Sequence, residues 1–166
     1  MEPVGDVKIM IKDKALLKSL EENAEKASPL RSQANGLALA FLGDAVYDVG
    51  IRRYLLEAGL TKPNRLHRKA TQYVSAKAQA KIAQAMIDRG EWTEEELAVF
   101  KRGRNAKSHT SAKNSDIVTY RIASGFEAVM GYLSLDGQEE RLGELIQKSI
   151  EVIEMNAEKG KEEANG

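Results

Sequence analysis

Two acidic residues, Asp44 and Glu127, interrupt stretches that are otherwise apolar or small. Asp44 lies within residues 36–47 (GLALAFLGDAVY), and Glu127 lies within residues 124–131 (SGFEAVMG). If both segments are core helices, each carboxylate lies largely out of water, where an unpaired charge costs several kcal/mol. A carboxylate in that position pairs with a cation, shifts its pKa or binds a metal ion. The two acids therefore indicate a shared metal site built on two helices.

The composition restricts which metal such a site could bind. The chain contains no cysteine and only two histidines, His67 and His109, which lie far apart in the sequence. Disulfides and thiolate sites are excluded, and a histidine-rich zinc site is not expected. Oxygen ligands favour Mg²⁺, with Mn²⁺ as a substitute. The alternative from spacing alone is that the acids form buried ion pairs with an arginine such as Arg52 or Arg121.

The elements that must position these acids are predicted to be helices. Ala, Leu, Glu, Lys and Gln are abundant, and no segment shows the period-two alternation of β-branched residues that is typical of strands. The 166 residues suit one domain with a substantial core. We expect an all-α chain with an N-terminal extension carrying one helix at 1–31, a single domain at 32–157 and a polar flexible tail at 158–166.

Capping and breaking residues predict where the helices begin and end. Pro63 suits a first helical turn, Ser75 can cap a helix, and Thr93 opens a capping box. Gly103 is expected to close that short helix, and Gly137 to separate the last two helices. The remaining predicted helices cover residues 12–27, 32–58, 63–73, 75–89 and 115–135 and an amphipathic segment after 137, with a loop at 104–115.

Three glycines recur every seven residues within the longest predicted helix, at Gly36, Gly43 and Gly50. Each costs about 0.5–1 kcal/mol relative to alanine in a helix interior. Close approach of another backbone or of a ligand would explain that cost. For Gly36 and Gly50, tight helix packing alone is an equal alternative.

Charge is balanced overall, with 25 basic and 25 acidic residues, but it is unevenly distributed. Residues 61–81 hold six Lys or Arg and no acid, and residues 101–121 hold six more against one acid, Asp116. A basic run is usually a solvated face, yet two of them in one small domain favour a polyanionic partner. Such side chains contact phosphates without reading base sequence.

The N-terminal ten residues carry Glu2 and Asp6 and no long apolar run, so no signal peptide is expected. No stretch approaches the roughly 20 apolar residues needed to cross a bilayer. We therefore expect a soluble, cytoplasmic protein with no membrane partner.

Several segments resemble a known family. Residues 39–46 (LAFLGDAV) resemble the signature helix of the ribonuclease III catalytic domain, and residues 126–133 (FEAVMGYL) resemble its second acidic helix. Further segments are similar to the Mini-ribonuclease III branch, and together the resemblance covers about residues 35–142. These segments are 35–40 (NGLALA), 61–64 (TKPN) with 66–67 (LH), 74–77 (VSAK), 101–108 (KRGRNAKS) and 119–121 (TYR).

The resemblance implies an all-α, homodimeric, ribonuclease III-like endonuclease that depends on magnesium and cleaves double-stranded RNA. The branch matures the 23S ribosomal RNA precursor, lacks a separate double-stranded RNA-binding domain, and raises the expectation of an accessory ribosomal protein. Asp44 matches the family's catalytic aspartate and Glu127 its metal-binding glutamate, so both are expected to act in catalysis and to hold the metal. The expected RNA-binding residues are Arg65, Arg68, Lys69, Lys101, Arg102, Arg104 and Lys107.

The sequence departs from full-length ribonuclease III at three acidic positions. Ala40 and Leu37 stand where that family has glutamates, and Ser124 stands where it has an aspartate. The Mini branch shares such losses. They leave two acids that can be assigned to the site, and the sequence is compatible with either one or two metal ions there. The alternative function is a non-catalytic module that binds structured RNA or the ribosome. A helical protein-interaction module would explain the amphipathic helices but not the basic segments.

Other polar and aromatic residues have plainer interpretations. His67 is expected on a helix surface rather than on RNA, and Asp48 is expected to pair with Arg52 rather than to orient water. Trp92 is expected to pack at a helix entrance. Tyr47, Tyr132 and Leu133 are assigned to the core or to a dimer interface.

Overall fold

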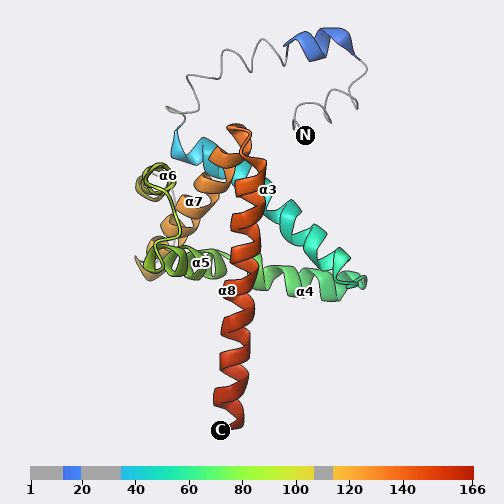
Figure 1. The fold of residues 1–166 in the computed structure, drawn as a ribbon, viewed down its shortest axis with the longest axis vertical. Helices are drawn as coiled ribbons and strands as arrows, with labels where there is room; N and C mark the ends of the chain where they lie inside the picture. The colour runs from blue at the N-terminus through green and yellow to red at the C-terminus, as the bar shows by residue number, and fades with distance from the viewer. Residues whose placement is uncertain (1–12, 20–34, 107–113) are drawn as a thin grey trace.

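The computed structural model describes residues 13–19, 35–106 and 114–166, and every regular element in these ranges is a helix (Figure 1). The expected all-α class is confirmed. Asp13 caps a short helical turn at residues 14–19 by accepting a hydrogen bond from the Ala15 amide at 2.9 Å. The main helices are α3 (Gly36–Glu57), α4 (Pro63–Val74), α5 (Ala76–Asp88), α6 (Glu94–Asn105), α7 (Asn114–Leu135) and α8 (Glu139–Asn165).

The centre of the fold is the crossing of α3 and α7. Tyr47 of α3 and Phe126 of α7 are fully buried there, with their rings edge to face at a centroid distance of 5.0 Å. The Tyr47 hydroxyl also donates to the carbonyl oxygen of Tyr73 at 2.9 Å, which fixes the end of α4 against α3. Figure 1 shows α8 in front of this crossing, α5 and α6 to its left and α4 to its lower right. The core expected for Tyr47, Tyr132 and Leu133 is confirmed, since all three are buried.

Local capping chemistry sets most of the helix boundaries. The side chain of Asn35 accepts from two amides at the start of α3, and Ser75 caps α5. Thr93 and Glu96 form the complete capping box predicted for α6. Gly103 does not end that helix, which continues to Asn105. A Cβ at Gly103 would lie 2.9 Å from the Cα of Gly125, so this glycine serves the close packing of α6 on α7.

The glycine repeat of α3 meets three different helices in turn. A Cβ at Gly36 would lie 2.6 Å from a carbonyl oxygen of α6, and one at Gly43 would lie 2.6 Å from the carbonyl carbon of Glu127 in α7. A Cβ at Gly50 would lie 2.8 Å from the Ile146 side chain of α8. Close helix packing therefore explains all three positions, and the neighbour at Gly50 is a side chain rather than a backbone.

A buried ion pair joins the start of α6 to α8. Arg141 donates to both carboxylate oxygens of Glu96, at 2.8 and 3.0 Å, and to the carbonyl oxygen of Glu91 at 2.7 Å. Burial alone would raise the pKa of Glu96, but the hydrogen bonds from Arg141 and from the Thr93 amide outweigh it and lower that pKa. Trp92 is buried beside this pair and packs on the Phe100 ring, as expected for a helix entrance.

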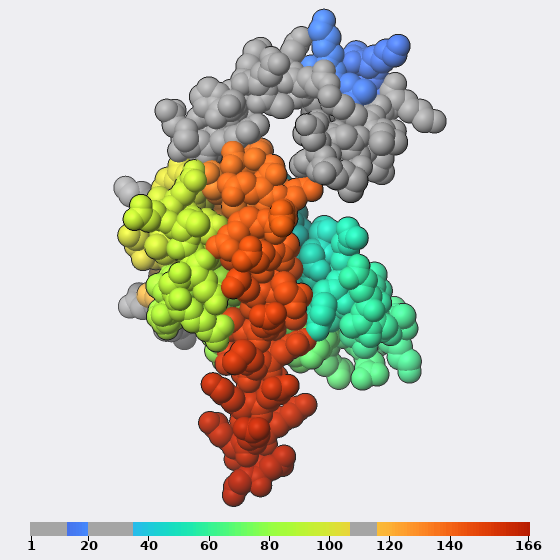
Figure 2. All heavy atoms as spheres, in the orientation of Figure 1, coloured from blue at the N-terminus to red at the C-terminus, as the bar shows by residue number. Residues whose placement is uncertain are grey.

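The last helix extends well beyond the body of the molecule (Figures 1 and 2). Glu154 accepts hydrogen bonds from the hydroxyl groups of Tyr54 and Tyr73, which hold α8 against α3 and α4. The helix then continues to Asn165, although the sequence predicted a flexible tail from residue 158. Oppositely charged side chains three and four residues apart in this segment favour the helical conformation.

The remaining boundaries differ slightly from expectation. α7 begins at Asn114, one residue earlier than predicted, and α6 continues to Asn105, two residues into the predicted loop at 104–115. Most of the first predicted helix, the start of the second and residues 107–113, including Lys107, lie outside the described residues. In the described ranges, no helix combines the length and the apolar character that crossing a membrane requires.

Candidate active site

The backbones of α3 and α7 touch at two glycines, and this contact determines where the two acids lie. A Cβ at Gly43 would be 2.8 Å from the amide nitrogen of Gly131, and one at Gly131 would be 2.9 Å from the carbonyl carbon of Leu39. Asp44 directly follows the first glycine, and Glu127 precedes the second by one helical turn. Their carboxyl groups consequently meet and share a hydrogen bond. The convergence predicted from the sequence is present in the structure.

The electrostatics of this pair are unusual. Burial of Glu127, followed by the negative charge of Asp44 and the hydrogen bond to it, raises the pKa of Glu127 to about 8. At neutral pH Glu127 therefore holds a proton between the two carboxyl groups. A cation bound to both acids would take the place of that proton, because it removes the repulsion that retains it.

The predicted burial of Asp44 is wrong. Its side chain is exposed, and so is the neighbouring Phe41, which has 86% of its surface exposed. The apolar run on α3 has two faces: one packs on α7, and the other exposes Phe41 and Asp44 to solvent. Glu127 is half-buried, so the pair lies at the edge of the core with one carboxyl group open to solvent.

The alternative of a buried ion pair is also wrong. Arg52 donates to Asp48 at 2.8 Å, one turn after Asp44, as expected for that pair. Arg121 is exposed, and within the described ranges it forms no ion pair with Asp44 or Glu127. Among the described residues, Asp44 is therefore the charged neighbour of Glu127, and neither Arg52 nor Arg121 pairs with either acid.

The donor set fits Mg²⁺. This ion accepts one or two carboxylates and completes its coordination with water and substrate phosphate oxygens. Among the residues that the structure describes, no group of three or more His, Cys, Asp or Glu side chains is arranged to hold an ion. Asp44 and Glu127 can thus supply two ligands, and Ser124, which is buried one turn before Glu127, adds no charge.

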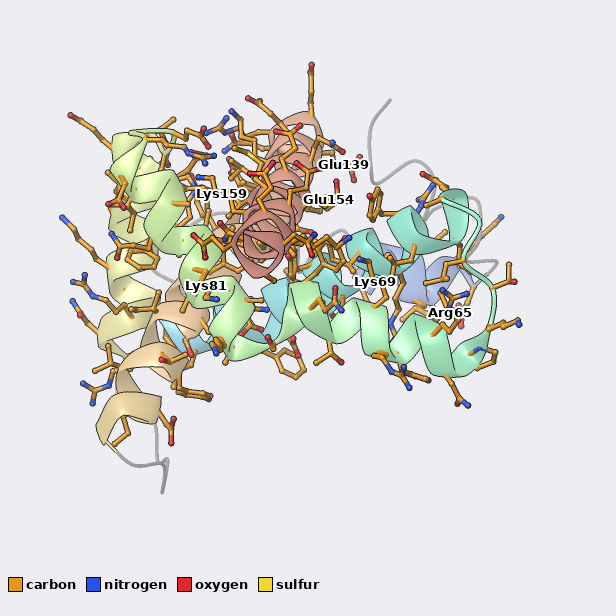
Figure 3. All side chains as sticks on the ribbon, turned by 90° about the horizontal axis from the view of Figure 1, so that it is seen from below. Arg65, Lys69, Lys81, Glu139, Glu154 and Lys159 are labelled. Atoms are coloured by element: carbon orange, nitrogen blue, oxygen red, sulfur yellow. The ribbon has the colours of Figure 1, made fainter. Side chains whose placement is uncertain are left out.

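The predicted RNA-binding residues lie on two separate helices. Arg65, Arg68 and Lys69 belong to α4, where Figure 3 shows Arg65 and Lys69, and Lys69 approaches the Tyr73 ring at 5.7 Å. Lys101, Arg102 and Arg104 belong to α6, which lies near the start of α3, whereas α4 lies near its end (Figure 1). These two groups form no single patch on one chain. His67 is exposed on α4, as expected.

Comparison with known proteins decides the family. Residues 37–138 match the ribonuclease III domain, a range that includes both Asp44 and Glu127. The chain belongs to the ribonuclease III family. The curated relatives place it in the Mini-ribonuclease 3 branch, as the sequence motifs indicated.

Two of these relatives show how much of the branch the chain covers. Mini-ribonuclease 3 of Enterococcus faecalis is 60% identical over 127 residues, which cover 76% of this chain and 96% of that protein. Mini-ribonuclease 3 of Streptococcus pneumoniae is 56% identical over 120 residues, which cover 72% and 94%. A crystal structure of a protein from Fusobacterium nucleatum superposes with a TM-score of 0.62 at 31% identity, covering 71% of this chain and 93% of that one.

Within this ribonuclease III fold, sequence reasoning missed two residues that matter to the site. Gly131 carries no expectation of its own in the sequence, although it is the partner of Gly43 at the helix contact. The signal available was the small residue one turn after Glu127 in an otherwise bulky segment. Phe41 belongs to the apolar run around Asp44, and no pattern within one chain could have shown its exposure.

Proposed function

We propose that this chain is a magnesium-dependent endoribonuclease that cleaves double-stranded RNA at the Asp44–Glu127 pair. Membership of the ribonuclease III family makes it an endoribonuclease of that type, acting on duplex RNA. The observation that supports this site is the shared hydrogen bond of the two carboxyl groups, with the pKa of Glu127 raised to about 8. When Glu127 gives up its proton, the two adjacent carboxylates carry two negative charges, which suits a divalent cation.

The proposed roles of the two residues follow from their environments. Asp44 and Glu127 would hold Mg²⁺, or Mn²⁺ as its substitute, and the bound ion would supply an activated water and stabilise charge on the phosphate. Asp44 is exposed, which suits a substrate as wide as duplex RNA that cannot enter a narrow pocket. Glu127 must lose its proton before it can act as a ligand. We therefore expect the fraction of chains with Mg²⁺ bound at the site to increase with pH.

We further propose that the basic residues of α4 and α6 contact the RNA backbone. Duplex RNA is recognised mainly by its shape, through phosphates and 2′-hydroxyl groups. Because α6 lies near the start of α3 and α4 near its end, the two helices can contact separated phosphates along the RNA (Figure 1). The proposed contacts are Arg65, Arg68, Lys69, Lys101, Arg102, Arg104 and Lys107.

A homodimer is part of this proposal. Phe41 and Val49 are 86% and 56% exposed on α3, about two turns apart, and Phe41 lies beside Asp44 on one side of the helix. Exposed apolar residues grouped in this way commonly mark a protein interface. A second copy covering them would place two acidic pairs in one assembly, so that each could cut one strand of the duplex.

The natural substrate proposed here is the 23S ribosomal RNA precursor in the cytoplasm, with an accessory ribosomal protein as a further partner. Its support is the similarity to the Mini-ribonuclease 3 relatives over nearly their whole length. Incubation of the chain with a precursor stem and with an unrelated duplex of equal length tests this point. Preferential cleavage of the precursor stem supports it, and equal cleavage of both contradicts it.

The central experiment compares cleavage of duplex RNA with and without Mg²⁺ by the parent chain and by Asp44→Asn. We expect cleavage only with Mg²⁺, and a loss of at least 100-fold in Asp44→Asn, by analogy with the loss of a charge-stabilising group. Asp88→Asn, an exposed aspartate on α5, is the matched control and should retain activity. Binding without cleavage by the parent would instead support the non-catalytic RNA-binding module.

A further inference from the structure

A groove between α5, α6 and α7 has a lining that the proposed chemistry does not require. Its volume is about 370 Å³, and the three helices around it lie together on the left of Figure 1. Ile87, Phe100, Val118 and Ile122 form its apolar walls. Val118 has 59% of its surface exposed at this groove, an unusual exposure for a large apolar side chain. The groove can therefore accept an apolar group from outside the chain.

The same groove is positively charged. Arg104 and Arg121 line it, and no acidic residue does. Within the part of the chain that the structure describes, neither arginine forms an ion pair with an acidic side chain. Two unneutralised guanidinium groups beside apolar walls suit a ligand that has both an anionic and an apolar part.

One of these guanidinium groups is already held in place. Arg104 lies over the Phe100 ring at 5.6 Å, and its Nε donates to the Asn105 side chain at 3.1 Å. RNA bases stack on guanidinium planes of this kind, and an ordered plane loses less entropy when a base binds. Gln84 Nε2 already donates to Asp88 at 2.8 Å and Asn105 Oδ1 accepts from Arg104, so the Gln84 carbonyl oxygen and the Asn105 amide nitrogen are the atoms that could meet a base edge. A nucleotide, with one flat base and one phosphate, matches this set.

The position of the groove relates it to the acidic pair. Arg121 and Ile122 precede Glu127 on α7 by five or six residues, a rise of about 8–9 Å along the helix axis. At 100° per residue, Arg121 and Ile122 also lie about 120° and 140° around α7 from Glu127, so an RNA strand that meets both places follows the side of this helix. Paired bases are stacked inside a duplex and cannot enter such a groove, whereas an unpaired base can turn outwards.

We propose that this groove binds one unpaired nucleotide of the RNA substrate, with its base against Arg104 and the apolar walls and its phosphate near Arg121. This inference rests on the proposed function. It specifies that RNA duplexes with a bulged or frayed nucleotide near the cleavage site are the preferred substrates. Arg121, Gln84 and Val118 thereby become determinants of selectivity outside the acidic pair.

Binding measurements with the Asp44→Asn chain, which avoids cleavage, test the proposal. A perfect duplex is compared with duplexes of equal length in which a single unpaired nucleotide is moved along one strand. We expect the best bulged duplex to bind about fivefold or more tightly than the perfect one, the gain expected from stacking one base. Adding Arg121→Gln or Gln84→Ala should bring this ratio close to one. Arg53→Gln, which removes an exposed arginine on α3, should leave the ratio unchanged.

Several outcomes overturn the proposal. Equal affinity of the chain for every duplex overturns it. A preference for bulged RNA that persists in Arg121→Gln also overturns it. So does a loss of affinity in Arg121→Gln that is equal for bulged and perfect RNA. Saturation by free nucleoside monophosphates without any preference among the duplexes would assign the groove to a free nucleotide. Binding of duplex RNA without preference refutes only this inference, whereas failure of the parent chain to bind or cleave any duplex refutes the proposed function as well. Thermal melts of each variant verify that the fold is intact.

Discussion

The proton held between Asp44 and Glu127 should make the metal-free chain less stable as pH rises. The pKa of Glu127 is about 8 in the folded chain, against 4.5 for an unperturbed glutamate. Between these values the folded state binds the proton more tightly than the unfolded state does. The contribution of Glu127 to the free energy of unfolding is therefore fully present below the unperturbed pKa of 4.5. It is lost as pH rises towards and through the folded pKa of about 8. Glu127→Gln removes the titrating group and keeps the shape and a hydrogen-bond donor towards Asp44.

The size of the effect follows from the burial of the pair. Each pKa unit corresponds to about 1.4 kcal/mol, but Glu127 is only half-buried and Asp44 is exposed, so water screens the interaction strongly. We expect Glu127→Gln to gain about 1–2 kcal/mol relative to the parent between pH 5.5 and pH 9 in buffer containing a chelator. Burial is the largest cause of the shift, so Asp44→Asn should reproduce only part of this gain.

Urea unfolding at several pH values measures this difference directly. Glu57→Gln, at the exposed end of α3, is the control and should show no change with pH relative to the parent. Adding Mg²⁺ at pH 9 should stabilise the parent and leave Glu127→Gln nearly unaffected, because the ion replaces the proton at the same two oxygens. A free-energy difference that is constant with pH, or that grows towards acid, would refute the assigned proton.

Three further substitutions test the fold and the assembly. Gly131→Ala should lower the free energy of unfolding by about 3 kcal/mol or more, since the new methyl group would meet the α3 backbone; an unchanged urea midpoint would contradict the helix contact. Phe41→Glu should halve the mass measured by light scattering, from the dimer proposed for the parent to a monomer. It should not lower the melting temperature, because the Phe41 side chain is 86% exposed within one chain. A dimeric mass in this variant would exclude Phe41 from the interface. Arg141→Gln should cost about 2–4 kcal/mol by leaving buried Glu96 without its cation, and a melting temperature equal to that of the parent would contradict that role.

The features that sequence analysis predicted well depend on chemistry within a few residues. Asn35, Ser75 and Thr93 bond to amides two or three positions ahead, so the residue types themselves indicate where the helices begin. Gly103 shows the limit of such reasoning. A glycine after a short helical segment can end the helix or can admit a neighbouring helix, and only the position of α7 shows that the second applies here.

The acidic pair was predictable in composition but not in environment. Apolar residues on one face of a helix indicate that this face is buried. They do not indicate whether another part of the same chain or another molecule buries it. Tyr47 and Phe41 look alike in the sequence, yet one is fully buried and the other is 86% exposed. Asp44 shares the exposed side with Phe41, which is why it can meet a large substrate. If a second copy covers Phe41, the apolar run of α3 describes burial in the dimer, and the single acid within it marks the part of the interface that must stay open to RNA.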